Sequence, residues 1–115
     1  MRSIAFLAPA ALAAAASIAQ AHTTRDLLFR CSQDEVTCAA KIRDGLWRLE
    51  NPPPGRPVIK LCPPHDLSDK NLVEQVAGWI NEQSPGYDNL DEDDSIAAAL
   101  TALYPCGGIK GLNGN

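Results

Sequence analysis

The sequence predicts an all-α protein, a small bundle of about four helices stapled by two disulfides. Apolar residues recur at helical spacing in four separate segments. A Ser, Thr or Asp that can cap a helix stands near the start of the first three, and acidic residues, which the helix macrodipole favours there, stand near the start of the fourth. Proline- and glycine-rich stretches separate the later segments, and four cysteines are distributed among them. No segment shows the strict alternation of apolar and polar residues that is typical of a half-buried strand.

The chain opens with the features of a secretory signal peptide, which we assign to residues 1–21. Met1-Arg2 is positively charged, Ile4 to Ile18 is an almost unbroken apolar run, and Ala19-Gln20-Ala21 fits a signal-peptidase site. A membrane anchor is the alternative, but this run of about 15 residues is shorter than the roughly 20 of a typical span. Because an alanine-rich signal is typical of bacteria, we expect a periplasmic protein that leaves the membrane after cleavage.

The part of the chain expected to remain divides into a helical domain, residues 22–106, and a flexible tail, residues 107–115. It carries nine basic residues against 14 acidic ones, a net charge of −5. This balance disfavours nucleic acid as a partner, since its binding needs a basic surface. An anionic membrane surface is disfavoured for the same reason.

Four cysteines, Cys31, Cys38, Cys62 and Cys106, supply the stabilisation that so small a core needs. An even number of cysteines in an oxidising compartment predicts two disulfides. A zinc site is the alternative, but zinc ligands usually occur in pairs about two to four residues apart. Here the gaps are 6, 23 and 43 residues, and the spacing leaves all three disulfide pairings open.

The first two helices are expected over Thr24 to Cys31, capped by Thr23 or Thr24, and over Asp34 to Leu49, capped by Ser32 or Asp34. Trp47 is expected to close the edge of the core. The residues expected to face inward are Leu27, Leu28 and Cys31 in the first helix and Cys38, Ile42, Leu46 and Leu49 in the second.

Asn51 to Pro57 contains four prolines and a glycine, which ends the second helix and predicts a long, semi-rigid connection. A third helix is expected from Asp66 or Ser68 to Ser84-Pro85-Gly86. The acidic stretch from Tyr87 to Asp94 leads into the fourth, which ends at Pro105. The inward residues expected here are Leu72, Val73, Val76 and Ile80, then Ile96, Ala99, Leu100 and Leu103.

Residues that carry catalysis are sparse, so we expect a binding protein and not an enzyme. Paired cysteines are not nucleophiles, and no serine stands in a nucleophile-elbow motif. His65 lies in a Pro-Pro-His-Asp turn that favours a surface role. The run Asp91-Glu92-Asp93-Asp94 lacks the alternating ligands and central glycine of a calcium loop, and we expect a solvated helix start. We expect no metal and no cofactor.

The spacing of these features resembles one known family over Arg25 to Cys106, nearly the whole expected domain. The family comprises the Rap/Tai-type periplasmic immunity proteins, which protect bacteria from type VI secretion amidase effectors. The residues that carry the resemblance are Asp26-Leu27-Leu28 before Cys31, Cys38 in a helix with Ile42 and Gly45, Cys62-Pro63, and Ala98-Ala99-Leu100 leading to Tyr104-Pro105-Cys106.

The resemblance implies a small helical protein, often a homodimer, that binds a peptidoglycan amidase and obstructs its cleft with a loop. Two segments suit that role, the proline-rich Asn51 to Lys60 and the acidic Tyr87 to Asp94. The residues expected to contact the partner are Arg56, Tyr87, Asp91 and Glu92. Ordinary connecting loops are the alternative for both segments. For the protein as a whole, the alternative is a periplasmic stress or acid chaperone, or a helical module that binds some other partner.

Overall fold

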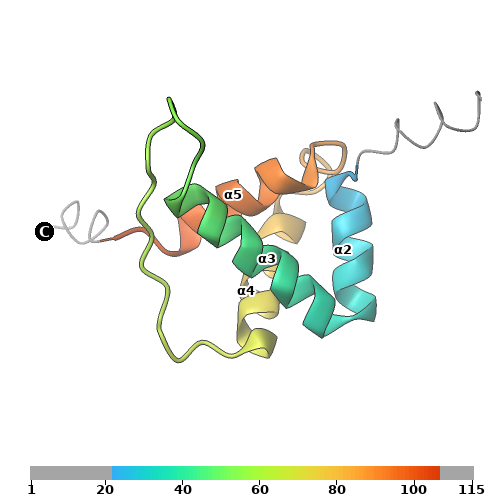
Figure 1. Ribbon diagram of the computed structural model, residues 1–115. Helices are drawn as coiled ribbons and strands as arrows, with labels where there is room; N and C mark the ends of the chain where they lie inside the picture. The colour runs from blue at the N-terminus through green and yellow to red at the C-terminus, as the bar shows by residue number, and fades with distance from the viewer. Residues whose placement is uncertain (1–21, 107–115) are drawn as a thin grey trace, which may run out of the picture.

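A computed structural model describes residues 22–106, and this part of the chain is all-helical (Figure 1). The helices are α2 (Thr24–Gln33), α3 (Glu35–Glu50), α4 (Asp69–Glu82) and α5 (Glu92–Leu103). The predicted all-α class and the number of helices in this region are therefore confirmed. None of these helices has the length and apolar character needed to cross a membrane. The predicted signal peptide and tail lie outside the described residues.

Each helix begins at a side chain that accepts a hydrogen bond from the first turn, as the sequence predicts for α2, α3 and α4. Thr23 caps α2 in a reciprocal pair with Asp26, in which each side chain accepts a hydrogen bond from the other residue's backbone N–H. Asp34 caps α3 and Ser68 caps α4, which settles the alternatives left open above. Asp91 caps α5. These contacts satisfy backbone donors that a helix start otherwise leaves unpaired.

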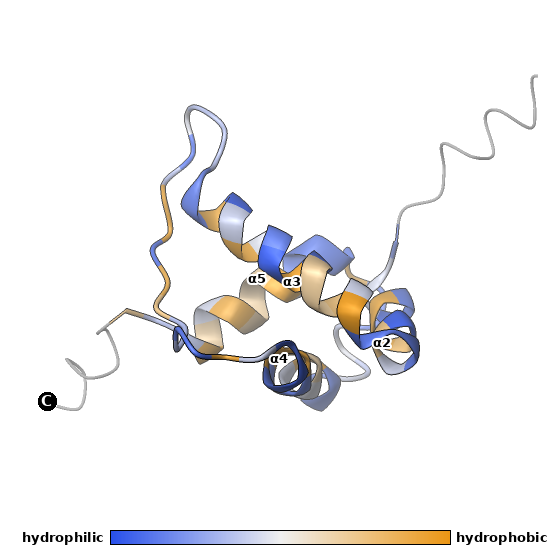
Figure 2. Ribbon diagram, turned by 60° about the horizontal axis from the view of Figure 1, so that its bottom comes forward, coloured by the Kyte–Doolittle hydropathy of each residue, from blue (hydrophilic) through white to orange (hydrophobic). Residues whose placement is uncertain are grey.

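The predicted apolar stripes meet in one core, and in Figure 2 the hydrophobic faces of the helices turn towards each other. Leu28, Leu46, Leu49 and Leu103 are only half-buried and pack against its edge. The predicted core positions that are buried are Leu27, Cys31, Cys38, Ile42, Leu72, Val73, Val76, Ile80, Ile96, Ala99 and Leu100. The pattern of inward residues read from the sequence is thus confirmed, although Leu28 and the residues at the ends of the α3 and α5 stripes are less buried than the rest.

Thr24, one of the two candidate caps, is instead a buried polar residue. Its hydroxyl hydrogen-bonds to the hydroxyl of Ser95 on α5 and donates to the carbonyl oxygen of Leu90 at 2.9 Å. The pair satisfies both hydroxyls inside the core, where an unpaired polar group is costly.

Gly45 allows α3 and α5 to pack closely. A methyl group added at Gly45 would lie 2.8 Å from Cγ2 of Ile96, closer than two carbon atoms can approach without a shift. The absence of a side chain at Gly45 therefore fixes the spacing of these two helices beside the core.

Two disulfides join Cys31 to Cys38 and Cys62 to Cys106, which resolves the pairing that the sequence left open. The first links the end of α2 to the start of α3. The second ties the segment before α4 to the end of α5, where Leu61 and Pro105 form an isolated β-bridge. The N–H of Cys62 donates to the carbonyl of Tyr104 at 2.8 Å beside it. Both bonds fit an oxidising extracytoplasmic compartment.

Trp47 does not close the core; its position was predicted wrongly. The residue is 61% exposed on the outer face of α3, which it shares with Val36. Successive helical residues are rotated by about 100°. Trp47 lies two residues from both Gly45 and Leu49, which face inward, and is therefore turned about 200° away from each.

Candidate partner-binding site

The proline-rich segment 51–60 projects from the helical body as a loop, at the upper left of Figure 1 and again in Figure 2. It leaves α3 at Asn51, whose N–H donates to the carbonyl of Trp47 at 2.9 Å. It returns beside the same helix, where the N–H of Ile59 donates to the carbonyl of Leu49 at 3.0 Å. The two ends of the loop are therefore pinned close together.

A tight turn forms the outer part of this loop. The N–H of Arg56 donates to the carbonyl of Pro53 at 3.2 Å, and Gly55 between them has a φ of 93°, which glycine adopts without strain. The neighbouring prolines restrict the backbone further, because each ring fixes its own φ. Arg56 and Val58 are both exposed, Val58 to 65%. The loop therefore presents a cation and an apolar side chain on a backbone with few alternative conformations.

A groove of about 430 Å³ lies between this loop, the end of α3 and the start of α5. Its walls are mainly apolar, with Leu49 and Ala97 from the helices facing prolines and Ile59 from the loop. Arg48, Arg56, Asp93 and Asp94 supply the charged groups around it. We call this feature the loop groove.

The charged residues of the loop groove differ in how they are paired. Arg48 lies 2.9 Å from the carboxylate of Asp44, and Asp93 lies 2.9 Å from Nζ of Lys41. Within residues 22–106, by contrast, neither Arg56 nor Asp94 has an ion-pair partner, and both are exposed. One cation and one anion of the groove are thus available to a ligand.

Tyr87 and Asp91, two of the residues expected to contact a partner, are engaged within the fold. The half-buried ring of Tyr87 packs edge-to-face against Trp79, with ring centroids 5.8 Å apart. The carboxylate of Asp91 accepts the N–H of Asp93 at 2.9 Å as the cap of α5. Neither residue lines the loop groove. The structure thus gives both of them a local structural role.

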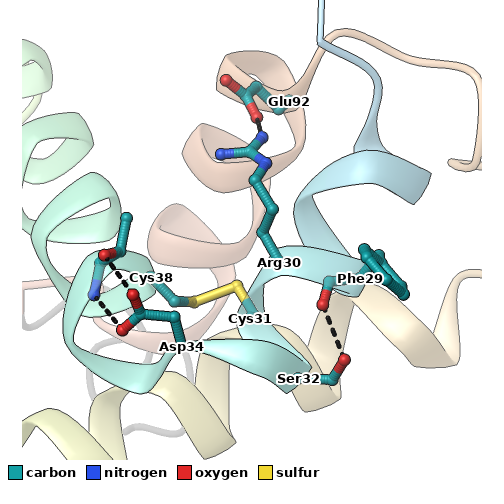
Figure 3. The surroundings of a disulfide bond; sticks show 8 residues. Phe29, Arg30, Cys31, Ser32, Asp34, Cys38 and Glu92 are labelled. Atoms are coloured by element: carbon teal, nitrogen blue, oxygen red, sulfur yellow. Dashed lines mark hydrogen bonds and ion pairs between the residues drawn. A yellow bond between two sulfur atoms is a disulfide. The ribbon is translucent and has the colours of Figure 1, made fainter.

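Glu92 is not part of a solvated helix start; that expectation is wrong at this position. The residue is only 5% exposed, and its carboxylate pairs with Arg30 of α2, as Figure 3 shows, and with Nζ of Lys41 of α3 at 3.2 Å. Burial lowers the pKa of Lys41, but hydrogen bonds to Asp93 and Glu92 outweigh it and raise that pKa overall. Glu92 therefore joins three helices, and we no longer expect it to contact a partner protein.

The structure brings together only one pair of the features predicted for partner binding. Arg56 and the end of the acidic stretch, at Asp93 and Asp94, border the same groove, whereas Tyr87 lies elsewhere. Sequence reasoning missed Arg48 and Ala97 as groove residues. A helical projection would have placed Ala97 three residues after Asp94 on the same face of α5, but nothing in the sequence places the loop opposite it.

Comparison of the chain with protein-family models, with curated proteins and with solved structures found no match.

Proposed function

We propose that this protein is a periplasmic immunity protein that binds a peptidoglycan amidase effector and blocks its cleft with the 51–60 loop, without catalysis of its own. The observation that carries the proposal is the projecting loop itself, which presents exposed Arg56 and Val58 on a pinned, proline-rich backbone. The resemblance of the cysteine and core pattern to the Rap/Tai-type family supports the choice of partner.

The loop is well suited to enter a cleft because little of its freedom remains to be lost. The hydrogen bond from Ile59 to Leu49 closes its base, and Cys62, three residues further on, is covalently fixed to Cys106. Docking a rigid loop costs less conformational entropy than ordering a flexible one. Arginine is also enriched among residues that dominate interface energies. We therefore retain Arg56 as the principal contact and add Val58.

The test is a titration of purified peptidoglycan amidases with the oxidised domain, following affinity and amidase activity together. We expect tight binding and loss of activity for the wild type. Arg56→Ala and Val58→Asp should weaken both at least tenfold, which is about 1.4 kcal/mol of binding free energy. Lys70→Ala is the matched control, because Lys70 is exposed on α4 and, within the described part of the chain, pairs only with Glu74 of the same helix. Unchanged inhibition by both loop variants would reject the loop assignment.

A chaperone is the second candidate, and the exposed apolar residues of α3 favour it. Val36 and Trp47 are 69% and 61% exposed on one face of that helix, where they are accessible to unfolded clients. Suppression of aggregation of unrelated proteins at low pH, lost in Trp47→Lys and retained in Arg56→Ala, would support this function.

The resemblance also implies a homodimer. Sedimentation of the wild-type protein measures whether it is a monomer or a dimer.

A further inference from the structure

We propose that the loop groove binds an extended polypeptide segment from one wall of the amidase cleft, with an apolar side chain of that segment at its centre. A carboxylate of that segment would face Arg56 and a cationic side chain would face Asp94. This inference rests on the proposed function and adds to it a pocket that selects the partner.

The position of the groove follows from the geometry of a loop that enters a cleft. A cleft has a wall on each side of whatever fills it, and one side of the 51–60 loop faces the helical body. The loop groove is the space between that side of the loop and α5. A wall of the cleft that passes on the inner side of the loop must therefore occupy this space. Its volume, about 430 Å³, lies within the range of about 300–1,000 Å³ typical of ligand pockets.

The apolar walls of the groove determine what can lie at its centre. Leu49 and Ala97 form the helical side, and Pro53 and Ile59 lie across from them on the loop. Prolines have no N–H to donate, so this part of the loop offers an inserted segment apolar surface and carbonyl oxygens. An aliphatic or aromatic side chain gains free energy by leaving water there, whereas an unpaired polar one does not.

The charges determine which end of the segment lies at which wall of the groove. Asp93 and Arg48 already have partners within the fold, whereas Arg56 and Asp94 have none within residues 22–106. These two opposite charges come from different walls, the loop and α5. A segment with its acid and base in the reverse order would place like charges together, and such contacts exclude wrong partners.

The experiment compares the wild type with Ala97→Phe, which fills the groove without changing the outer face of the loop. Ala102→Phe is the matched control, since Ala102 is exposed on the same helix and does not line the groove. The probe is a peptidoglycan amidase inhibited by the wild type. We expect Ala97→Phe to weaken inhibition at least tenfold and Ala102→Phe to leave it unchanged. Circular dichroism establishes that each variant is folded.

Asp94→Lys provides an independent reading if Ala97→Phe does not fold, because it changes an exposed charge and fills no space. We expect Asp94→Lys to weaken inhibition at least fivefold. The control is Asp66→Lys, because Asp66 is exposed outside the groove, and we expect it to inhibit as well as the wild type does. Wild-type inhibition that neither Ala97→Phe nor Asp94→Lys weakens would overturn the groove assignment and leave the loop assignment standing.

Two other outcomes would also overturn the inference. If the wild type inhibits no amidase, the proposed function and the groove assignment both fail. If sedimentation shows a wild-type dimer that Ala97→Phe dissociates, the groove is occupied by a second copy of this chain and not by a wall of the amidase cleft.

Discussion

Two regions of the molecule use the same kinds of residue in opposite ways. Where α2, α3 and α5 meet, the carboxylate of Glu92 is buried and is paired with Arg30 and Lys41. Two residues further along α5, Asp94 is exposed beside the loop groove without an ion-pair partner in residues 22–106. A rotation of about 200° along one helix separates a charge that holds the fold together from a charge that is free to bind.

The two disulfides also differ between these two regions of the molecule. Cys31 and Cys38 are seven residues apart and join helices that the chain already makes neighbours. Cys62 and Cys106 are 44 residues apart and fix the end of the molecule from which the loop projects. Where α2, α3 and α5 meet, a short-range disulfide thus accompanies the ion pairs of Glu92, whereas the loop end is fixed by a long-range covalent link. Each of the following substitutions tests one part of this contrast.

Removing the Cys62–Cys106 disulfide should have the largest effect. In the chain-entropy account of cross-links, closing a 44-residue separation is worth about 4 kcal/mol, against about 2.5 kcal/mol for seven residues. We expect the double variant Cys62→Ala/Cys106→Ala to lose more unfolding free energy than Cys31→Ala/Cys38→Ala, measured by urea denaturation. Equal losses would mean that strain or packing, and not loop length, determines the contribution of each disulfide.

Glu92→Gln should have the next largest effect, because it leaves Arg30 and Lys41 without the buried charge that pairs them. Breaking a fully buried ion pair costs about 3–5 kcal/mol, and we expect about 2–3 kcal/mol here because both cations remain partly exposed. Thermal and urea unfolding measure the loss. Asp94→Asn is the matched control on the same helix and should change stability by no more than about 0.5 kcal/mol. A similar loss in both variants would contradict the division between the two carboxylates.

The sequence predicted the helices, the caps of the first three and most of the core, because these features depend on residues close together in the chain, although it missed the core residues Ala39, Leu61 and Tyr104. Val73 and Val76, for example, lie on the inner side of α4 through helical periodicity alone. Trp47 was predicted wrongly although the helical rotation from Leu49, which was expected to face inward, already turns it outward. Glu92 was predicted wrongly for a different reason, because its burial is decided by Arg30 and Lys41 on two other helices. The loop groove was missed for the same reason as Glu92, since its walls are far apart in sequence.

Gly45→Ala tests the boundary between the two regions, since Gly45 both lines the groove and sets the approach of α3 to α5. The added methyl group would lie 2.8 Å from Ile96, and overpacking of this kind costs about 1–3 kcal/mol. Gly78 is also within a helix, and a methyl group there meets nothing within 4 Å. Gly78→Ala should therefore stabilise by about 0.5–1 kcal/mol, the usual helical preference. A stabilising Gly45→Ala would show that Ile96 moves away freely.

The smallest expected effect concerns Asp34, the exposed residue that caps the start of α3. A side-chain hydrogen bond and a backbone hydrogen bond from Thr37 hold the pKa of Asp34 below its usual value of 3.8. Because the folded pKa is the lower one, the carboxylate stabilises the fold fully above about pH 4, and this contribution disappears as the pH falls through the folded value.

Asp34→Asn keeps a capping side chain but removes the titrating group. Between about pH 5 and pH 2 the variant should therefore lose less unfolding free energy than the wild type, as measured by urea denaturation at each pH. Asp66→Asn is the control, because Asp66 is exposed and caps no helix, and its acid profile should follow that of the wild type. If Asp34→Asn and the wild type lost stability in parallel, acid sensitivity would have to come from other carboxylates, and the cap would act through its geometry and not its charge.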